Sequence, residues 1–399
     1  MPASGFNSPC SGRVQPRLAR EDGPMRNLVL LVSAQAAANL LPALDPFIKP
    51  ERAVLFVTGA MKERAANLAA ALMEAGVKTR EVSLSDEHDF ARTQAEFHAF
   101  ASGMEGEELA INLTGGTKLM ALAAFTVADA YGWRAFYLDL DTDEVVWLET
   151  GGELQTKRQR LGQQLRLTSY LKGYGFHVEQ LAKPQEQIRH RELLKALILG
   201  IEGLGPALGA VNVLAKGAAG ALQAKLPPEN LRPQKFELLL DDFERANILS
   251  REGDAVRFAS EEDRHFANGG WLELHVYQTL SAVHGEIGIR DKAVNLQLKD
   301  GSGVRNELDV AFLSKNRLFV IECKTARLDG AGGAEKANDT LFKLSELARR
   351  VGGIGTRSML VSYRPLNRAE RQLATALGVE VVAVNDLARL GERLKVWCK

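Results

Sequence analysis

Two neighbouring segments near the C-terminus carry the residues best suited to chemistry. Residues 306–325 read NELDVAFLSKNRLFVIECKT, which indicates two strands joined by a short polar turn. With a two-residue turn at the centre, Asp309 lies opposite Glu322 and Glu307 lies opposite Lys324. Because side chains alternate between the two faces of a strand, these carboxylates and the ammonium group would gather on one face of the sheet.

Such a cluster is suited to a divalent cation. Carboxylates held close together repel each other unless a cation lies between them, and oxygen ligands suit Mg²⁺ or Mn²⁺. A nearby lysine could orient water or hold a phosphate oxygen, so metal-assisted hydrolysis of a phosphodiester bond is the natural chemistry. The alternative is a solvent-facing hairpin with cross-strand salt bridges. The opposite face would receive Leu308, Val310, Ile321 and Cys323, all suited to a core.

A helix is expected upstream of this hairpin. Residues 268–273 read NGGWLE and open a helical pattern that runs to about residue 283. Glu273 lies in the first turn, where a buried acid would be a further metal ligand and an exposed one an ordinary solvated carboxylate. A strand near 286–298 and alternating helices and strands over 335–397 would complete a small α/β domain.

The N-terminal part alternates strands and helices, which is typical of a mostly parallel sheet. Ligands of such sheets bind beyond the carboxyl ends of the strands, and there the loops 33–35, 58–62 and 112–118 are polar or rich in glycine. Paired glycines let backbone amides approach a ligand, and a capped helix N-terminus favours an anion. The pattern predicts a phosphate or nucleotide cradle, or else a plain glycine turn; the Walker A spacing is absent. The strands are expected at 28–32, 53–57, 77–84, 109–113, 134–140 and 144–148.

The composition fits a globular protein of two or three domains. The chain has 399 residues, and its 50 basic and 50 acidic side chains give a net charge of zero, which excludes a uniformly basic nucleic-acid binder. Its 3 cysteines form neither a disulfide framework nor a zinc motif, which favours a reducing cytoplasm. No apolar run is long enough to cross a bilayer, so no membrane association is expected.

These patterns divide the chain into four parts. Residues 1–24 are expected to be a disordered tail or an over-extended start, and 25–152 a ligand-binding domain. Residues 153–262 are expected to form a helical linker with a winged-helix-like part, acting as a packing or dimerisation spacer. Residues 263–399 form the domain with the acid cluster.

The motifs resemble those of a known nuclease family. Asp309 followed by Glu322-x-Lys324 looks like the PD-(D/E)xK nuclease core, although Glu307-Leu308-Asp309 stands where that core has Pro-Asp. With NGGWLE and the segment LTGGTK at 113–118, it resembles the CRISPR-associated nucleases that carry an N-terminal CARF (CRISPR-associated Rossmann fold) domain. The resemblance implies an α/β chain with a Rossmann-like CARF domain, a helical middle and a restriction-endonuclease-like C-terminal domain.

The resemblance also implies a function. In that family, paired CARF domains bind cyclic oligoadenylate, often cyclic tetra-adenylate, made by type III CRISPR complexes, and binding switches on metal-dependent cleavage of nucleic acid in antiviral defence. Carried over, Glu273, Asp309 and Glu322 would hold Mn²⁺ or Mg²⁺ and Lys324 would be catalytic, in a homodimer that cuts DNA, RNA or both, with single-stranded substrates favoured. The ligand groove would be lined by Ser33, Gln35, Thr58, Gly59, Met61, Thr114, Gly115, Gly116, Thr117 and Lys118.

Two other functions stay open. A restriction or repair nuclease, with the first domain only a scaffold, would cleave without a second messenger. A ligand sensor or transcriptional regulator would bind DNA through the winged-helix-like part and would not cleave, but it would not need the acid cluster. In the gated nuclease, ligand would close the CARF pair and the linker would reorient the nuclease domains.

Overall fold

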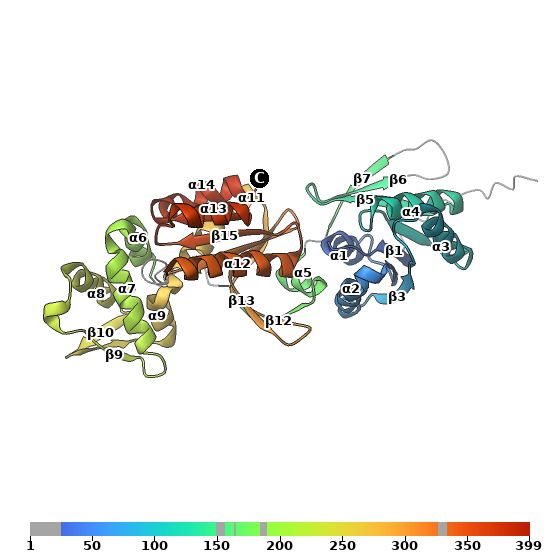
Figure 1. The fold of residues 1–399 in the computed structure, drawn as a ribbon. Helices are drawn as coiled ribbons and strands as arrows, with labels where there is room; N and C mark the ends of the chain where they lie inside the picture. The colour runs from blue at the N-terminus through green and yellow to red at the C-terminus, as the bar shows by residue number, and fades with distance from the viewer. Residues whose placement is uncertain (1–24, 149–155, 163–164, 184–189, 326–332) are drawn as a thin grey trace, which may run out of the picture.

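The molecule consists of three bodies in a row (Figure 1). The computed structural model describes residues 25–148, 156–162, 165–183, 190–325 and 333–399, so the expected tail at 1–24 lies outside the described residues. The N-terminal domain forms one end, the C-terminal domain lies at the centre, and the helical region around α7 and α8 (Ile201–Gly217 and Gln234–Arg245) forms the other end.

The N-terminal domain is built on a seven-stranded sheet in the order β3-β2-β1-β4-β5-β6-β7. Its strands are β1 Asn27–Leu31, β2 Arg52–Val57, β3 Lys78–Ser83, β4 Leu109–Asn112, β5 Arg134–Asp139, β6 Glu144–Leu148 and β7 Thr156–Arg160. The first five strands are parallel, which confirms the expected Rossmann-like alternation. The sequence pattern did not indicate β7, because its polar residues lie on a solvated edge strand paired with β6. The helices are α1 Ala37–Leu44, α2 Lys62–Glu74, α3 Phe90–Ser102 and α4 Lys118–Tyr131.

The strand order creates a place for a ligand in this sheet. From β1 the chain moves outward to β2 and β3, whereas from β4 it moves the other way to β5. The carboxyl ends of β1 and β4 therefore meet at a topological switch point, where ligands of open α/β sheets bind. Both strands are buried throughout, as their unbroken apolar runs require in a sheet covered on both faces.

The C-terminal domain has a six-stranded sheet in the order β16-β15-β14-β13-β12-β8. One face packs against α12, and the other packs against α10 and α14. The edge strand β8 lies more than a hundred residues before its partner β12 in the chain, a pairing that no local pattern indicates. The strands are β8 Phe176–Ala182, β12 Ile289–Asp300, β13 Arg305–Ser314, β14 Arg317–Lys324, β15 Arg357–Ser362 and β16 Val379–Ala383. The helices are α5 Leu167–Gly173, α10 Trp271–Ala282, α11 His284–Ile287, α12 Gly333–Gly352, α13 Arg368–Ala376 and α14 Leu390–Trp397.

The third body contains α6 Arg191–Leu199, α7, α8, α9 Glu261–His265 and a small sheet in the order β10-β11-β9. The strands of that sheet are β9 Gln223–Lys225, β10 Leu249–Glu252 and β11 Ala255–Phe258. Strands β10 and β11 form an antiparallel hairpin, and the body shares one hydrophobic core with the C-terminal domain. No single described helix meets the length and hydropathy needed to cross a membrane; α6 and α7 meet the test only jointly, across a bend of 119°.

Most of the segment expected to act as a spacer does not separate the other two domains. Figure 1 shows α7 and α8 on the far side of the C-terminal domain from the N-terminal domain. The two larger domains touch each other directly instead, through the turn after β5 and the turn between β13 and β14. Arg317 donates to Asp141 at 2.9 Å, and Asn316 and Arg290 both contact the carboxylate of Asp143.

Candidate functional site

The acid cluster is held by the hairpin of β13 and β14. Strand pairing runs from Ser314–Arg317 to Val310–Ile321, which confirms the predicted register over those residues. The turn residues Lys315 and Asn316 both have positive φ, 48° and 56°, as a tight two-residue hairpin turn requires.

The two strands stop pairing where the cluster begins. Beyond Val310 and Ile321, the backbone N–H of Cys323 donates to the carboxylate of Asp309 at 2.7 Å. A side chain has therefore replaced the backbone acceptor that a continued ladder would supply. This opening lets the carboxylate of Asp309 lie between the strands, close to Glu322.

The apolar side of the hairpin is largely as predicted. Val310, Ile321 and Cys323 are buried in one core cluster, but Leu308 packs in the other. The predicted alternation of side chains between the two faces is wrong at Leu308. The neighbouring strand β12 is irregular at this level: its pairing with β13 skips Asn295, which has a φ of 50°.

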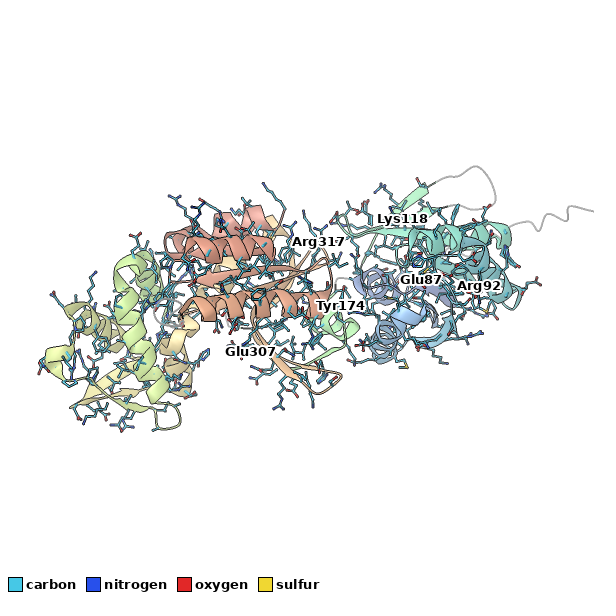
Figure 2. All side chains as sticks on the ribbon, viewed as in Figure 1. Glu87, Arg92, Lys118, Tyr174, Glu307 and Arg317 are labelled. Atoms are coloured by element: carbon cyan, nitrogen blue, oxygen red, sulfur yellow. The ribbon has the colours of Figure 1, made fainter. Side chains whose placement is uncertain are left out.

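Electrostatic repulsion is concentrated on Asp309. Burial and the neighbouring carboxylates of Glu322 and Glu273 raise the pKa of Asp309 to about 8. The three predicted metal ligands are therefore close enough to interact, although they come from α10, β13 and β14. Glu307 is exposed on the same hairpin, and Figure 2 shows it on the central domain.

Lys324 lies on β14, two residues after Glu322. Its ammonium group contacts the carboxylate of Glu322. Burial alone would lower the pKa of Lys324, but the carboxylates of Glu322 and Asp309 outweigh it and raise that pKa. Lys324 is therefore a firmly charged cation beside the acids, suited to hold a phosphate oxygen or to orient a water molecule.

Glu273 lies in the first turn of α10 with its side chain 17% exposed. The sequence reasoning did not single out its neighbour His265, whose Nε2 lies 3.7 Å from Oε2 of Glu273. Contact with the carboxylate of Glu273, which accepts from the imidazole, raises the pKa of His265 against the effect of burial, and the charge of Glu307 acts in the same direction. The spacing of eight residues across a non-helical turn gives no periodic signal for this contact.

The donor set fits a hard divalent cation. Three carboxylates from three elements repel each other around Asp309, and a cation would relieve that repulsion. In the part of the chain that the structure describes, no group of three or more such side chains is already arranged around a common point. The ion pair of Glu322 with Lys324 occupies an oxygen that a metal ion would otherwise attract.

Several of the residues predicted to line a ligand groove lie at the switch point of the N-terminal sheet. Two buried asparagines tie its strand ends together: Asn39 donates to the carbonyl of Leu31 at 2.9 Å, and Asn112 donates to Asn39 at 3.0 Å. Thr114 donates to Asn112 at 2.6 Å and accepts from the N–H of Leu138 at 2.7 Å. The loops after β1 and β4 are thus held together by polar contacts.

The glycine loop after β4 has the close approach that its sequence indicates. A Cβ on Gly115 would lie 2.1 Å from the carbonyl oxygen of Leu31, and Gly116 has a φ of +70°. Thr117 caps α4 by accepting from the N–H of Met120 at 3.2 Å. The structure therefore brings the loops of β1 and β4 together, and it leaves Lys118 exposed at the start of α4 (Figure 2).

The remaining predicted groove residues lie on the flanking loops. The hydroxyl of Ser33 accepts from the N–H of Gln35 at 3.3 Å, and Gln35 is exposed. Thr58 is buried directly after β2, Gly59 is exposed with open space around it, and Met61 is half-buried.

Comparisons with known proteins agree with these two sites. Residues 27–170 match the family model of the Card1 CARF domain, and residues 260–399 match that of the Card1-like endonuclease domain. Comparison with the curated proteins gave no match.

Three solved structures share the fold over most of the chain. Protein VC1899 from Vibrio cholerae is 27% identical with a TM-score of 0.81, over 94% of this chain and 98% of that one. Can2 from Sulfobacillus thermosulfidooxidans, solved with cyclic tetra-adenylate, is 28% identical with a TM-score of 0.75, over 94% and 99% of the two chains. A type III CRISPR defence DNA nuclease activated by cyclic oligoadenylate, 18% identical with a TM-score of 0.53 over 96% and 54%, is similar in fold alone.

Proposed function

Because this chain belongs to the CRISPR-associated nucleases with an N-terminal CARF domain, we propose that cyclic tetra-adenylate switches on its metal-dependent cleavage of nucleic acid in type III CRISPR defence. The observation that carries the proposal is the cluster of Glu273, Asp309, Glu322 and Lys324 within the part that matches an endonuclease family. The switch point, where open α/β sheets commonly bind ligands, supports placing the activator there.

The residues of the acid cluster have separate roles in this proposal. Glu273, Asp309 and Glu322 hold Mn²⁺ or Mg²⁺, which supplies an activated water and neutralises charge on the phosphodiester. Lys324 holds a phosphate oxygen or orients the attacking water. The substrate is DNA, RNA or both, with single strands favoured.

The proposal includes a homodimer. A cyclic ligand with repeated units fits across a two-fold axis that pairs two switch points. Helix α4, which starts at Lys118 beside the groove, exposes Leu119 and Leu122 at 38% and 57%. These side chains lie one turn apart on a helix, so they present an apolar strip that a second copy of the domain can cover.

Direct contact between the two domains offers a route for activation. Thr114 in the groove holds the N–H of Leu138, and β5 leads from there into the turn with Asp141 and Asp143. That turn contacts the tip of the β13–β14 hairpin at Asn316, and the far part of the same hairpin carries the acid cluster. A ligand that moves the end of β5 would therefore act on the hairpin without a flexible linker.

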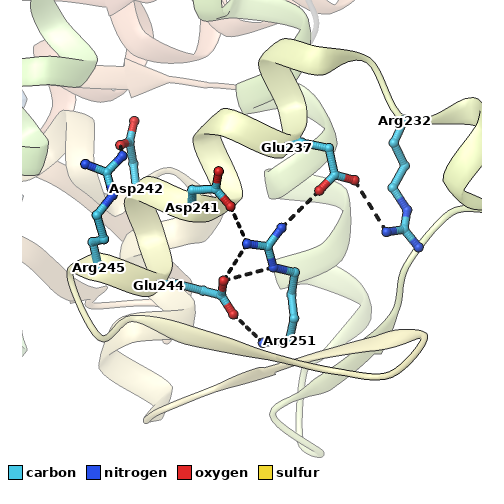
Figure 3. A network of polar contacts seen from close by, with 7 residues as sticks. All are labelled: Arg232, Glu237, Asp241, Asp242, Glu244, Arg245 and Arg251. Atoms are coloured by element: carbon cyan, nitrogen blue, oxygen red, sulfur yellow. Dashed lines mark hydrogen bonds and ion pairs between the residues drawn. The ribbon is translucent and has the colours of Figure 1, made fainter.

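A DNA-binding regulator is less well supported by the third body. Figure 3 shows that carboxylates on α8 surround the nearby arginines, so these cations are already neutralised. Arg251 contacts Glu237, Asp241 and Glu244, and Arg245 pairs with Asp242. Binding to a DNA backbone needs cations that can face phosphates, and this helix presents mainly acids.

Metal titration of the cleavage reaction tests the proposed chemistry. Labelled single-stranded DNA and RNA are incubated with activator in EDTA, Mg²⁺ or Mn²⁺. Cleavage with either metal and none in EDTA is expected, whereas cleavage in EDTA would contradict the metal-dependent assignment. One bound cyclic tetra-adenylate per two chains, measured by calorimetry and light scattering, is expected for the dimer, and one per chain would contradict it.

A further inference from the structure

His265 lies at the edge of the acid cluster, at the end of α9, and the function proposed above gives it no role. The turn Phe266–Gly270 connects it to α10, which carries Glu273. Its side chain is 50% exposed, and its Nε2 lies 3.7 Å from Oε2 of Glu273.

The two glycines of the NGGWLE motif shape the place where this imidazole lies. Gly269 has a φ of +116°, and a Cβ there would lie 2.1 Å from Oγ1 of Thr325, the residue after Lys324. A Cβ on Gly270 would lie 2.7 Å from Cδ2 and 2.9 Å from Nε2 of His265. Gly269 thus allows the turn to pack against the end of β14, and Gly270 leaves room for the histidine ring.

Each carboxylate of the cluster has its own donor or cation. The N–H of Cys323 donates to Asp309, and the ammonium group of Lys324 contacts Glu322. For Glu273, the cation at ion-pair distance among the described residues is His265, at 3.7 Å. Partners of this kind commonly orient metal-binding side chains and keep one oxygen free for the ion.

We propose that His265 is a positioning residue that holds Glu273 toward Asp309 and so completes the orientation of the three metal-binding carboxylates. This inference rests on the metal site of the proposed function. It also gives the glycine pair in the motif a physical purpose, since a larger residue at Gly270 would displace the ring from Glu273.

Calorimetric titration of the full-length protein with Mn²⁺ tests the inference. We expect His265→Ala to weaken Mn²⁺ binding by about 10–100-fold, the range seen when an outer partner of a metal ligand is removed. His265→Gln retains an N–H donor and should recover most of that affinity. Gly270→Ala, whose backbone conformation suits alanine, should weaken Mn²⁺ binding with His265 intact, and should add little in a protein that already carries His265→Ala.

His284→Ala is the matched control, because His284 is an exposed histidine in the same domain. Its Mn²⁺ affinity should equal that of the unmodified protein, and thermal unfolding should show that all variants are folded. Unchanged Mn²⁺ affinity in His265→Ala would overturn the inference. Glu273→Gln distinguishes failure of this inference from failure of the proposed metal site. If both His265→Ala and Glu273→Gln bind Mn²⁺ normally, the metal site itself is wrongly placed. If Glu273→Gln loses Mn²⁺ binding and His265→Ala does not, only the role of His265 is refuted.

Discussion

Removal of one charge should make the metal-free protein more stable. Asp309 is half-buried among carboxylates, and its pKa is raised to about 8. Asp309→Asn keeps the shape of the side chain and an oxygen that can accept from Cys323, but it cannot ionise. Folding of the variant therefore requires neither the uptake of a proton at this position nor a charge beside Glu322. The metal-free native site therefore lowers the stability of the folded protein, and the variant should recover that stability.

The size of the effect follows from the pKa. An acid whose folded pKa lies above its unfolded value binds more protons when folded, so the stability of the folded protein falls as pH rises between the two values. At pH 7 only the interval from the ordinary pKa of 3.8 up to pH 7 counts, because the folded group stays protonated until about pH 8; with about 1.4 kcal/mol per pKa unit, the cost is about 4 kcal/mol. We expect Asp309→Asn to raise the free energy of unfolding by about 2–4 kcal/mol at pH 7, and by under about 1 kcal/mol near pH 4.

Differential scanning calorimetry in EDTA at several pH values measures this difference for the transition of the C-terminal domain. Asp254→Asn removes an exposed carboxylate on another turn and should change stability by less than about 0.5 kcal/mol. Added Mn²⁺ should stabilise the unmodified protein more than the variant, because binding to the folded state adds stability. Equal stability of Asp309→Asn and the unmodified protein at pH 8 in EDTA would refute the electrostatic reasoning.

Three further substitutions test other parts of the molecule. Lys324→Met keeps the apolar stem but removes the charge, and it should slow cleavage by about 100-fold or more with cyclic tetra-adenylate binding unchanged; equal rates would exclude a catalytic lysine. Gly115→Ala places a Cβ 2.1 Å from the carbonyl oxygen of Leu31, so calorimetry should show at least about 10-fold weaker ligand binding, while Gly59→Ala, in open space, should leave folding intact. Asn316→Gly keeps the positive φ but removes the contact of the hairpin tip with Asp143, and it should lower ligand stimulation by about 10-fold without weakening ligand binding; full stimulation would exclude a route through Asn316.

Local patterns were sufficient to predict the hairpin that carries the acid cluster. A two-residue turn fixes the register as far as Val310 and Ile321. Asp309 and Glu322 follow directly after this pair, so their proximity could be predicted from the turn alone. The alternation of strands and helices likewise indicated the N-terminal sheet, because a parallel sheet needs a crossover between neighbouring strands. Both predictions rest on residues close together in the chain.

The spatial arrangement of the three parts of the molecule could not be predicted from local sequence patterns. Strand β8 joins β12 across more than a hundred residues, and this pairing places the C-terminal domain directly against the N-terminal one. The contact of His265 with Glu273 depends on a turn with a φ of +116° at Gly269, which has no periodicity. Long-range pairing and irregular turns depend on tertiary packing, and a single sequence carries little signal for either.

In the proposed function, a ligand bound to the N-terminal domain switches on cleavage by the C-terminal domain. One cleavage assay tests this most directly. Labelled single-stranded DNA and RNA are incubated with Mn²⁺ or Mg²⁺, with and without cyclic tetra-adenylate, beside the Glu322→Ala variant. We expect cleavage only with the ligand, and none in the variant, which should still bind the ligand. Equal cleavage without the ligand would favour a restriction or repair nuclease, and tight ligand binding with no cleavage of either substrate would favour a sensor; both results would contradict a ligand-gated nuclease.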